Sequence, residues 1–389
     1  MKNKVLTFCF LLISTFVFTQ EKTSWSDEHL YFKGYIKDLR IINFVPNAGI
    51  IQDNFIHNRL NFKYYINQKW TFAAEARNRL FYGESVKLNS SYASSVHIDH
   101  GLFSTSVLWI DESSLFLHSI LDRVYVDFQS NKWGVRVGRQ RINWGISSVW
   151  NPNDLFNAFN FANFDYEERP GSDGIRIQRY LKDGMSSYEV AAKLDTGKNN
   201  QVIAARYIFN KWNYDIQILG GVYFTDVALG VGFAGNLKNA GLKGETTYFQ
   251  DKLSLSKPGV LNATLGLDYT LRKGMSSGVS LLYNSQGFKD LSSLTSPSLL
   301  SFAVSPKNLM PSEWSIMGQL GYPLSPIIST SLAVIYAPQL DLFFLMPSVS
   351  TSISGNWELM VLGQSYFADA GSGVIHARTG LFIRTKFSF

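Results

Sequence analysis

Residues 376–389, HARTGLFIRTKFSF, end the chain and decide its fold class. Side chains alternate across a β-strand with a period of two residues, so each face of a strand collects every second residue. One face of this segment holds Phe389, Phe387, Thr385, Ile383 and Leu381, and the other holds Ser388, Lys386, Arg384, Gly380 and Arg378, with Phe382 as the exception. The pattern predicts a strand with one largely apolar face and one basic face.

A terminal strand that alternates in this way and ends on an aromatic residue resembles the closing strand of bacterial outer-membrane β-barrels. The resemblance implies an all-β transmembrane antiparallel barrel in the outer membrane of a Gram-negative bacterium. It also implies that Phe387 and Phe389 are the assembly signal read by the barrel-insertion machinery, and that this strand pairs with a first strand near residues 30–36. The alternative is an ordinary amphipathic strand at the end of a soluble domain.

The amino terminus has the features of a signal peptide. Lys2 and Lys4 precede an apolar run over residues 5–17, which is too short to span a bilayer and is followed by polar residues. We therefore predict a signal peptide over residues 1–20 and a single barrel over residues 21–389. The one cysteine, Cys9, lies in the first segment, so the mature chain would have neither a disulfide nor a thiolate metal site.

The composition agrees with a barrel whose strands have one face in lipid. Mean hydropathy is −0.03, and aromatic residues make up 15% of the chain. Beyond the signal segment no run approaches the roughly 18 apolar residues that a transmembrane helix needs. Apolar residues occur instead at every second position, which is typical of strands that face lipid on one side and water on the other.

Short turns alternate with longer polar stretches along the chain. Residues 67–69, 130–132, 210–211 and 355–356 each precede a tryptophan, and residues 182–184 and 272–274 contain glycine. The longer stretches are residues 83–120, 144–174, 250–258 and 287–311. The spacing predicts about 18 strands, with 16 as the alternative, and the resemblance implies short periplasmic turns and long extracellular loops.

A barrel of this size is too wide for its own side chains to fill, so we expect an aqueous lumen. A charge on the lipid face at mid-membrane costs about 2–4 kcal/mol, which predicts that basic residues in the strands face the lumen. The predicted pore-lining cations are Arg59, Lys63, Arg77, Arg79, Arg136, Arg176 and Arg206. Arg139 and Arg141 share the parity of the apolar Val135 and Val137. We interpret them as lying above the membrane, the alternative being a bulge at Gly138.

The most unusual internal segment begins at Gly138-Arg139-Gln140 and continues through Trp144-Gly145 to Pro152-x-Asp154. This GRQ…WG…PxD motif, on a strand that enters a long loop, resembles that of several porin-like outer-membrane families. The resemblance implies that the loop, about residues 144–174, folds inward and narrows the barrel. Its predicted constriction or docking residues are Trp150, Asp154, Asp165, Glu167 and Glu168, with the acids facing Arg59, Arg77, Arg79 and Arg136. Alternatively, the loop is external and its acids pair with rim arginines or bind lipopolysaccharide-associated cations.

Three function classes follow from this interpretation. The first is a porin or substrate-selective channel; the second is a barrel subunit of a larger outer-membrane machine for secretion, barrel assembly or nutrient uptake; the third is a surface enzyme. We predict no enzyme, no catalytic residues, no cofactor and no metal site, since His97-Ile98-Asp99-His100 lacks an evident third ligand. The expected partners are outer-membrane lipid and lipopolysaccharide, the barrel-assembly machinery and, in the second class, surface lipoproteins or other envelope proteins, but no nucleic acid.

Overall fold

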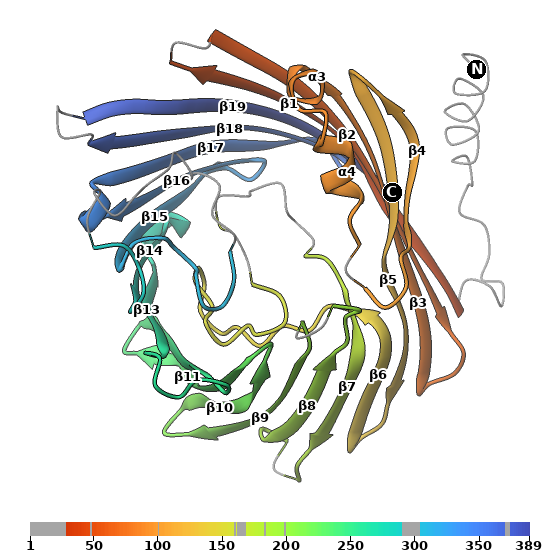
Figure 1. Ribbon diagram of the computed structural model, residues 1–389, viewed down its shortest axis with the longest axis vertical. Coiled ribbons are helices and arrows are strands. Elements are labelled where there is room, and N and C mark those ends of the chain that lie inside the picture. Colours follow the sequence, from red (N-terminus) through yellow and green to blue (C-terminus); the bar gives the residue numbers. More distant parts are fainter. Residues whose placement is uncertain are drawn as a thin grey trace.

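The computed structural model is an antiparallel β-barrel (Figure 1). It describes residues 29–46, 49–99, 101–158, 161, 169–182, 184–197, 200–289, 304–369 and 374–389. The elements, in chain order, are β1 (Leu30–Val45), β2 (Gly49–Tyr65), β3 (Trp70–Gly83), α3 (Glu84–Leu88), α4 (Tyr92–His97), β4 (Ser106–Glu112), β5 (Leu115–Gln129), β6 (Trp133–Gln140), β7 (Ser172–Tyr180), β8 (Ser187–Lys193), β9 (Val202–Lys211), β10 (Tyr214–Tyr223), β11 (Asp226–Leu237), β12 (Ala240–Asp251), β13 (Val260–Thr270), η1 (Arg272–Gly274), β14 (Ser276–Asn284), β15 (Trp314–Ser325), β16 (Ile328–Ala337), η4 (Pro338–Leu340), β17 (Leu342–Ser354), β18 (Trp357–Asp369) and β19 (Val374–Ser388).

The sheet closes on itself through its first and last strands. Of its 19 strands, β4 pairs only with β5, so 18 strands form the closed circuit. In the closing pair, Tyr35 of β1 lies opposite Ser388 of β19, and Gly34 and Phe389 exchange two backbone hydrogen bonds of 2.9 Å. Closure leaves no free edge in the circuit, which a barrel in lipid requires because unpaired backbone groups are costly there. The predicted fold class and strand number are confirmed, and the first and last strands pair as expected, but over residues 34–44 of β1 rather than 30–36.

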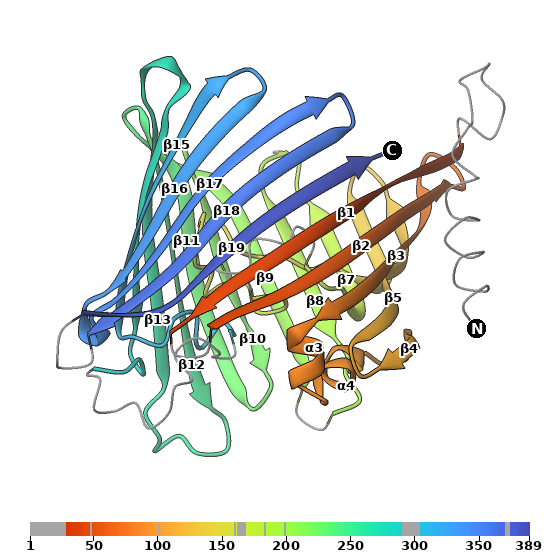
Figure 2. The ribbon, with the colours of Figure 1, turned by 90° about the horizontal axis from the view of Figure 1, so that it is seen from above.

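The two ends of the barrel differ in their connections (Figure 2). Turns of two to six residues join the strands at the end that holds the start of β1 and the end of β19. The opposite end holds the connections over residues 84–114, 141–171 and 285–313. The predicted asymmetry of short turns and long loops is thus confirmed. One turn was misplaced: β9 continues through Lys211, and the turn is Trp212-Asn213, whose φ angles of 56° and 62° suit a tight hairpin.

The expected polar stretch over residues 83–120 is wrong in its second half. It contains α3 and α4, and then the hairpin of β4 and β5. β4 pairs with residues 115–120 of β5, while β6 pairs with residues 124–129 of the same strand. The extra strand therefore occupies the part of β5 that β6 does not reach. Polar residues such as Asp111, Glu112 and His118 conceal this alternation in the sequence.

Inward and outward faces alternate as the sequence predicts. Trp70, Trp133 and Trp357 begin strands at the short-turn end and are 43%, 40% and 45% exposed. Tryptophan at this position is typical of a barrel's interfacial aromatic girdle. Within the described residues, no helix has the length and apolar character needed to cross a membrane.

Candidate functional site

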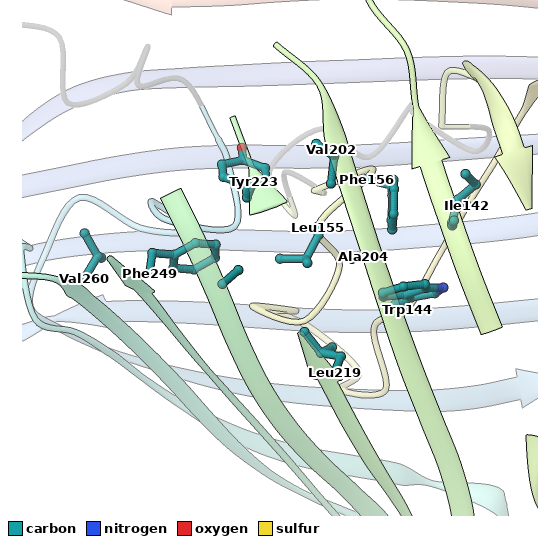
Figure 3. Packing of buried hydrophobic residues seen from close by; sticks show 12 residues of the cluster. Ile142, Trp144, Leu155, Phe156, Val202, Ala204, Leu219, Tyr223, Phe249 and Val260 are labelled. Atoms are coloured by element: carbon teal, nitrogen blue, oxygen red, sulfur yellow. The ribbon is translucent and has the colours of Figure 1, made fainter. Parts of the chain in front are cut away.

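The described part of the connection between β6 and β7, residues 141–158, 161 and 169–171, lies inside the ring of strands (Figure 1). We call it the lumen loop. Four of its side chains, Ile142, Trp144, Leu155 and Phe156, are buried against inward-facing residues of β8 to β13 (Figure 3). Further along, Val149 and Trp150 pack against inward-facing residues of β14 to β17. The lumen loop therefore contacts two separate parts of the inner surface.

Glu245 of β12 holds the lumen loop by its backbone. Its carboxylate, on a residue only 3% exposed, accepts hydrogen bonds from the amides of Ile146, Ser147 (2.6 Å) and Asn153 (3.0 Å). A charged acceptor for several amides makes strong bonds, and each buried amide left without one costs about 1–3 kcal/mol. One glutamate thus fixes the path of the loop on both sides of Trp150.

Asn153 fits closely against β11 and β12. Its side chain donates to the carbonyl of Val231 at 3.0 Å and accepts from the hydroxyl of Thr247 at 2.6 Å. A Cβ on Gly230 would lie 2.7 Å from the Asn153 Oδ1 atom, and one on Gly232 would lie 2.9 Å from Nδ2. The two glycines therefore make room for the lumen loop. The glycines of β11 are the sequence signal from which this contact could have been predicted.

Trp144 and two arginines share a second glutamate. The indole Nε1 of Trp144 donates to Glu189 of β8 at 2.7 Å. Arg176 and Arg206, both predicted pore-lining cations, each form an ion pair with Glu189 at 2.9 Å. Gln217 donates to the carbonyl of Trp144 at 3.0 Å. We call the inner surface of β8 to β13, with Glu189 and Glu245, the loop wall.

Asp154 lies in the interior of the lumen loop and does not meet the arginines of β2 and β3. It is fully buried, and its carboxylate pairs with Arg169 of the same loop at 2.8 Å. Burial raises the pKa of Asp154 to about 7, although Arg169 acts in the opposite direction. The expected opposition of Asp154 to Arg59, Arg77, Arg79 and Arg136 is therefore wrong. The other predicted acids, Asp165, Glu167 and Glu168, lie outside the described residues.

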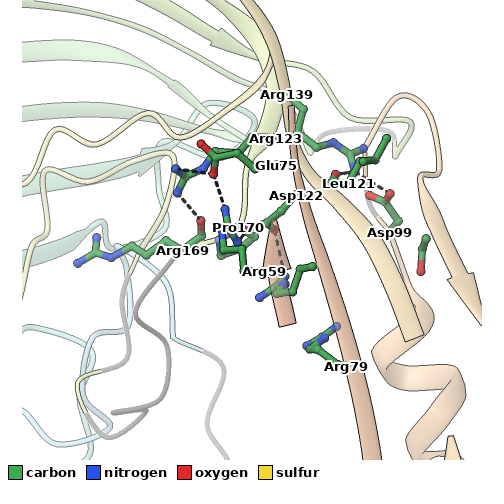
Figure 4. Close-up of polar contacts among 12 residues, drawn as sticks. Arg59, Glu75, Arg79, Asp99, Leu121, Asp122, Arg123, Arg139, Arg169 and Pro170 are labelled. Carbon is green, nitrogen blue, oxygen red and sulfur yellow. Dashed lines mark hydrogen bonds and ion pairs between the residues drawn. The ribbon is translucent and has the colours of Figure 1, made fainter. Parts of the chain in front are cut away.

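The opposite inner surface, formed by β2, β3 and β5, carries a group of cations (Figure 4). We call Arg59, Arg77, Arg79 and Arg123 on this surface the basic wall. Arg59 forms ion pairs with Glu75 and, at 2.7 Å, with Asp122, which also pairs with Arg77 at 3.0 Å. Arg123 pairs with Glu75 at 3.2 Å and donates to the carbonyl of Arg169 in the lumen loop at 3.3 Å. Three of the cations, Arg59, Arg77 and Arg123, thus share two carboxylates, whereas the Arg79 guanidinium contacts His118.

Two cavities adjoin the basic wall, and Arg77 and Arg79 line both. The first, of about 390 Å³, lies against α3 and α4 and is also lined by His57 and Arg378. The second, of about 280 Å³, is bounded by Phe156 and Asn157 of the lumen loop. These are spaces in which solutes could meet guanidinium groups.

The remaining predicted cations lie at other places on the inner surface. Arg136 of β6 forms an ion pair with Asp127 at 2.7 Å. Lys63 of β2 is half-buried, with its Nζ atom 6.0 Å from the ring centre of Tyr31. The roles of Asp122, Glu189 and Glu245 could not be predicted from the sequence, because an isolated inward acid does not indicate which residue it pairs with.

Arg139, at the long-loop end of β6, is only 7% exposed and lies among acidic partners. The pairing of β5 with β6 shows no register shift at Gly138, so the alternative of a parity-resetting bulge is wrong. Arg139 forms ion pairs with Asp99 at 2.8 Å and Asp173 at 2.7 Å, and its guanidinium also donates to the carbonyl of Phe103. Asp99, Phe103 and Thr105 thus cover this arginine.

The histidines near β4 form a polar chain. The hydroxyl of Ser106 lies 2.9 Å from Nδ1 of His97 and 2.7 Å from Nε2 of His118. A guanidinium nitrogen of Arg79 lies 3.0 Å from the other ring nitrogen of His118, Nδ1. Catalytic serine–histidine pairs are usually oriented by a carboxylate, whereas a cation stands in that place here. Among the described residues, no group of three or more His, Cys, Asp or Glu side chains could hold a metal ion.

Comparisons with known proteins identify the architecture. The sequence matches no protein family and no curated protein. Similar solved structures include Acinetobacter baumannii OccAB1 (TM-score 0.58, 11% identity, 94% of this chain and 99% of that one) and OccAB4 (0.57, 12%, 93% and 98%). Pseudomonas aeruginosa OccK11, also named OpdR, has a TM-score of 0.57 at 10% identity, over 96% of this chain and 100% of that one. These are outer-membrane porin structures, and the 18-stranded barrel fits an outer-membrane location.

Proposed function

We propose that this chain is a substrate-selective channel of the outer membrane, with a preference for anions. The observation that carries the proposal is the position of the lumen loop, which is fixed to the loop wall while its Arg169 carbonyl meets Arg123 of the basic wall. Solutes then pass beside the basic wall, where guanidinium groups outnumber carboxylates. Such a lining selects by charge as well as by size.

The sidedness and biogenesis belong to the same proposal. The short turns face the periplasm, the long loops face outward among lipopolysaccharide, and residues 1–20, outside the described residues, are a cleaved signal peptide. Phe387 and Phe389 act as the assembly signal for the insertion machinery. The similarity to solved porins supports these assignments, as does the aromatic belt at the short-turn end.

Planar-bilayer recording of the purified barrel tests this function. Discrete ohmic steps, with conductance that falls as organic anions replace chloride in order of increasing size, are the expected result. A barrel that is folded, as judged by heat-modifiable mobility, but electrically silent would contradict a channel. It would favour the alternative of a subunit in a larger machine with surface lipoproteins or other envelope proteins.

A further inference from the structure

One sector of the outer surface differs from the rest of the barrel. Over most of the circuit, outward positions carry exposed apolar side chains, such as Val190 (50%), Leu229 (60%) and Leu265 (47%). Across β1, β2, β3 and β5, which lie side by side in the sheet and in Figure 2, outward positions also carry polar and charged side chains. We call these residues the outer polar face: Asp38, Arg40, Asn54, Asn58, Asn78 and Ser119.

Register and burial show that these residues point outward. Asp38 lies between Lys37 and Leu39, which are 1% and 3% exposed, and Asn58 lies between His57 and Arg59, which are 5% and 0% exposed. Because the buried neighbours face the lumen side, the residues between them face the opposite side. Asn58 lies directly opposite Asn78, and Asn78 lies directly opposite Ser119, so one polar row crosses β2, β3 and β5.

The polar row is joined by hydrogen bonds. Asn78 donates to Asn58 at 3.0 Å, Ser119 donates to Asn78 at 2.6 Å, and the exposed Trp109 of β4 donates to Ser119 at 2.9 Å. The row therefore extends from β2 to the extra strand β4. Its amide and hydroxyl groups can each donate and accept hydrogen bonds with a binding partner.

The charged residues of the outer polar face, Asp38 and Arg40, make weaker hydrogen bonds than the polar row. The Asp38 carboxylate accepts from Asn54 at 3.3 Å, and the Arg40 Nε donates to Asn54 at 3.4 Å, both at the long end of the hydrogen-bond range. Within the part of the chain that the structure describes, neither charge forms an ion pair at 4 Å or less. Both residues are exposed and lie near the middle of β1. Facing lipid, a charge costs up to about 2–4 kcal/mol, depending on depth.

From this we infer that the outer polar face is an interface with a second copy of this chain, related by a twofold axis along the membrane normal. Such an interface is self-complementary, because each residue can meet its opposite number or a neighbour of it. Asp38 and Arg40 are two residues apart on one face, so the axis brings the carboxylate of each copy to the guanidinium of the other. The amide row satisfies an identical row in the same way. Phosphates of lipopolysaccharide would instead favour a surplus of cations, whereas these two charges cancel.

Cysteine cross-linking in outer membranes tests the interface. In a Cys9→Ser background the chain has no other cysteine, so Asp38→Cys, Asn58→Cys, Asn78→Cys and Ser119→Cys can be introduced one at a time. At least one of them should give a product of twice the monomer mass with a short bifunctional reagent. Val190→Cys and Leu265→Cys, exposed on other strands, are the matched controls and should stay monomeric. Monomers at all four positions, equal cross-linking at the controls or a product with another protein would each overturn the proposal.

A charge exchange tests the self-complementarity itself. Asp38→Arg places two like charges together across the axis, as does Arg40→Asp, so each variant should lower the dimer fraction in native mass spectrometry by about tenfold or more. The double exchange restores opposite charges and should restore the dimer. Heat-modifiable mobility of each variant shows that the barrel is folded. If both single variants remain dimeric, or the folded double variant remains monomeric, the assigned contact is wrong.

Discussion

The loop wall and the basic wall both carry carboxylates inside the barrel, but the carboxylates bind different groups. On the loop wall, Glu245 binds three backbone amides, and Glu189 binds Trp144 together with two arginines. Here the acids hold the lumen loop. On the basic wall, Glu75 and Asp122 bind only arginines, which outnumber them, and the cavities beside them are lined by Arg77 and Arg79. The loop wall therefore positions the lumen loop, and the basic wall is the surface that meets the solute.

Opening the barrel removes both walls at once, and is the largest expected effect. Phe389 pairs with Gly34, and the Phe387 ring lies 4.9 Å from that of Trp357. If these aromatic rings are the assembly signal, Phe387→Ser/Phe389→Ser should leave little barrel in the outer membrane and much degraded or aggregated chain. Heat-modifiable mobility of membrane fractions measures this. Phe343→Ser/Tyr336→Ser, an outward aromatic pair with ring centres 4.3 Å apart, is a control that should assemble far better. If the terminal variant reached the outer membrane in wild-type amounts, Phe387 and Phe389 would not be the assembly signal.

Loss of the Glu245 carboxylate should release the lumen loop while leaving the basic wall intact. Glu245→Ala leaves three loop amides without their acceptor, a cost of about 3 kcal/mol or more to the docked loop. We expect a larger and noisier single-channel conductance with little change in ion preference. Glu112→Ala, at an exposed position in the hairpin of β4 and β5, should leave both properties unchanged. If folded Glu245→Ala barrels had an unaltered conductance, the lumen loop would not lie in the conduction path.

Changing the pH should loosen the same loop more gently. Burial raises the pKa of Asp154 to about 7, above its ordinary value, so the docked loop favours the protonated acid. The resulting stabilisation is fully present below the ordinary pKa and declines as the pH rises through about 7. Conductance noise should therefore increase between pH 6 and pH 8, by less than in Glu245→Ala. Asp154→Asn should remove this component. If the increase persists in Asp154→Asn, another group causes it.

The sequence predicts the barrel better than it predicts the site. Period-two alternation and turn residues are local, so the closing strand, the strand number and the inward direction of Arg59 and Arg77 could be predicted from them. The partners of inward charges depend on register between strands far apart in the chain. Nothing near Glu245 indicates that it binds residues 146, 147 and 153, about a hundred positions earlier.

The hairpin of β4 and β5 and the pairing of Asp154 were missed for related reasons. β4 pairs with the half of β5 that does not pair with β6, and this unpaired half exists only once the sheet has formed. Asp154 was expected to face distant arginines, but Arg169 of its own loop lies 2.8 Å away. The folding of a long loop back on itself is not encoded in a short periodic pattern.

The ion preference of the open channel tests the central claim most directly. Replacing Arg77 and Arg79 by glutamate reverses two charges that line both cavities of the basic wall, whereas Arg272→Glu/Lys273→Glu reverses two charges in the exposed turn η1. Reversal potentials in a salt gradient should show anion preference for the wild type and for the turn variant. Arg77→Glu/Arg79→Glu should shift the potential toward cation preference. An unchanged reversal potential in that double variant, with the barrel folded and conducting, would contradict the basic wall as the surface that meets the solute.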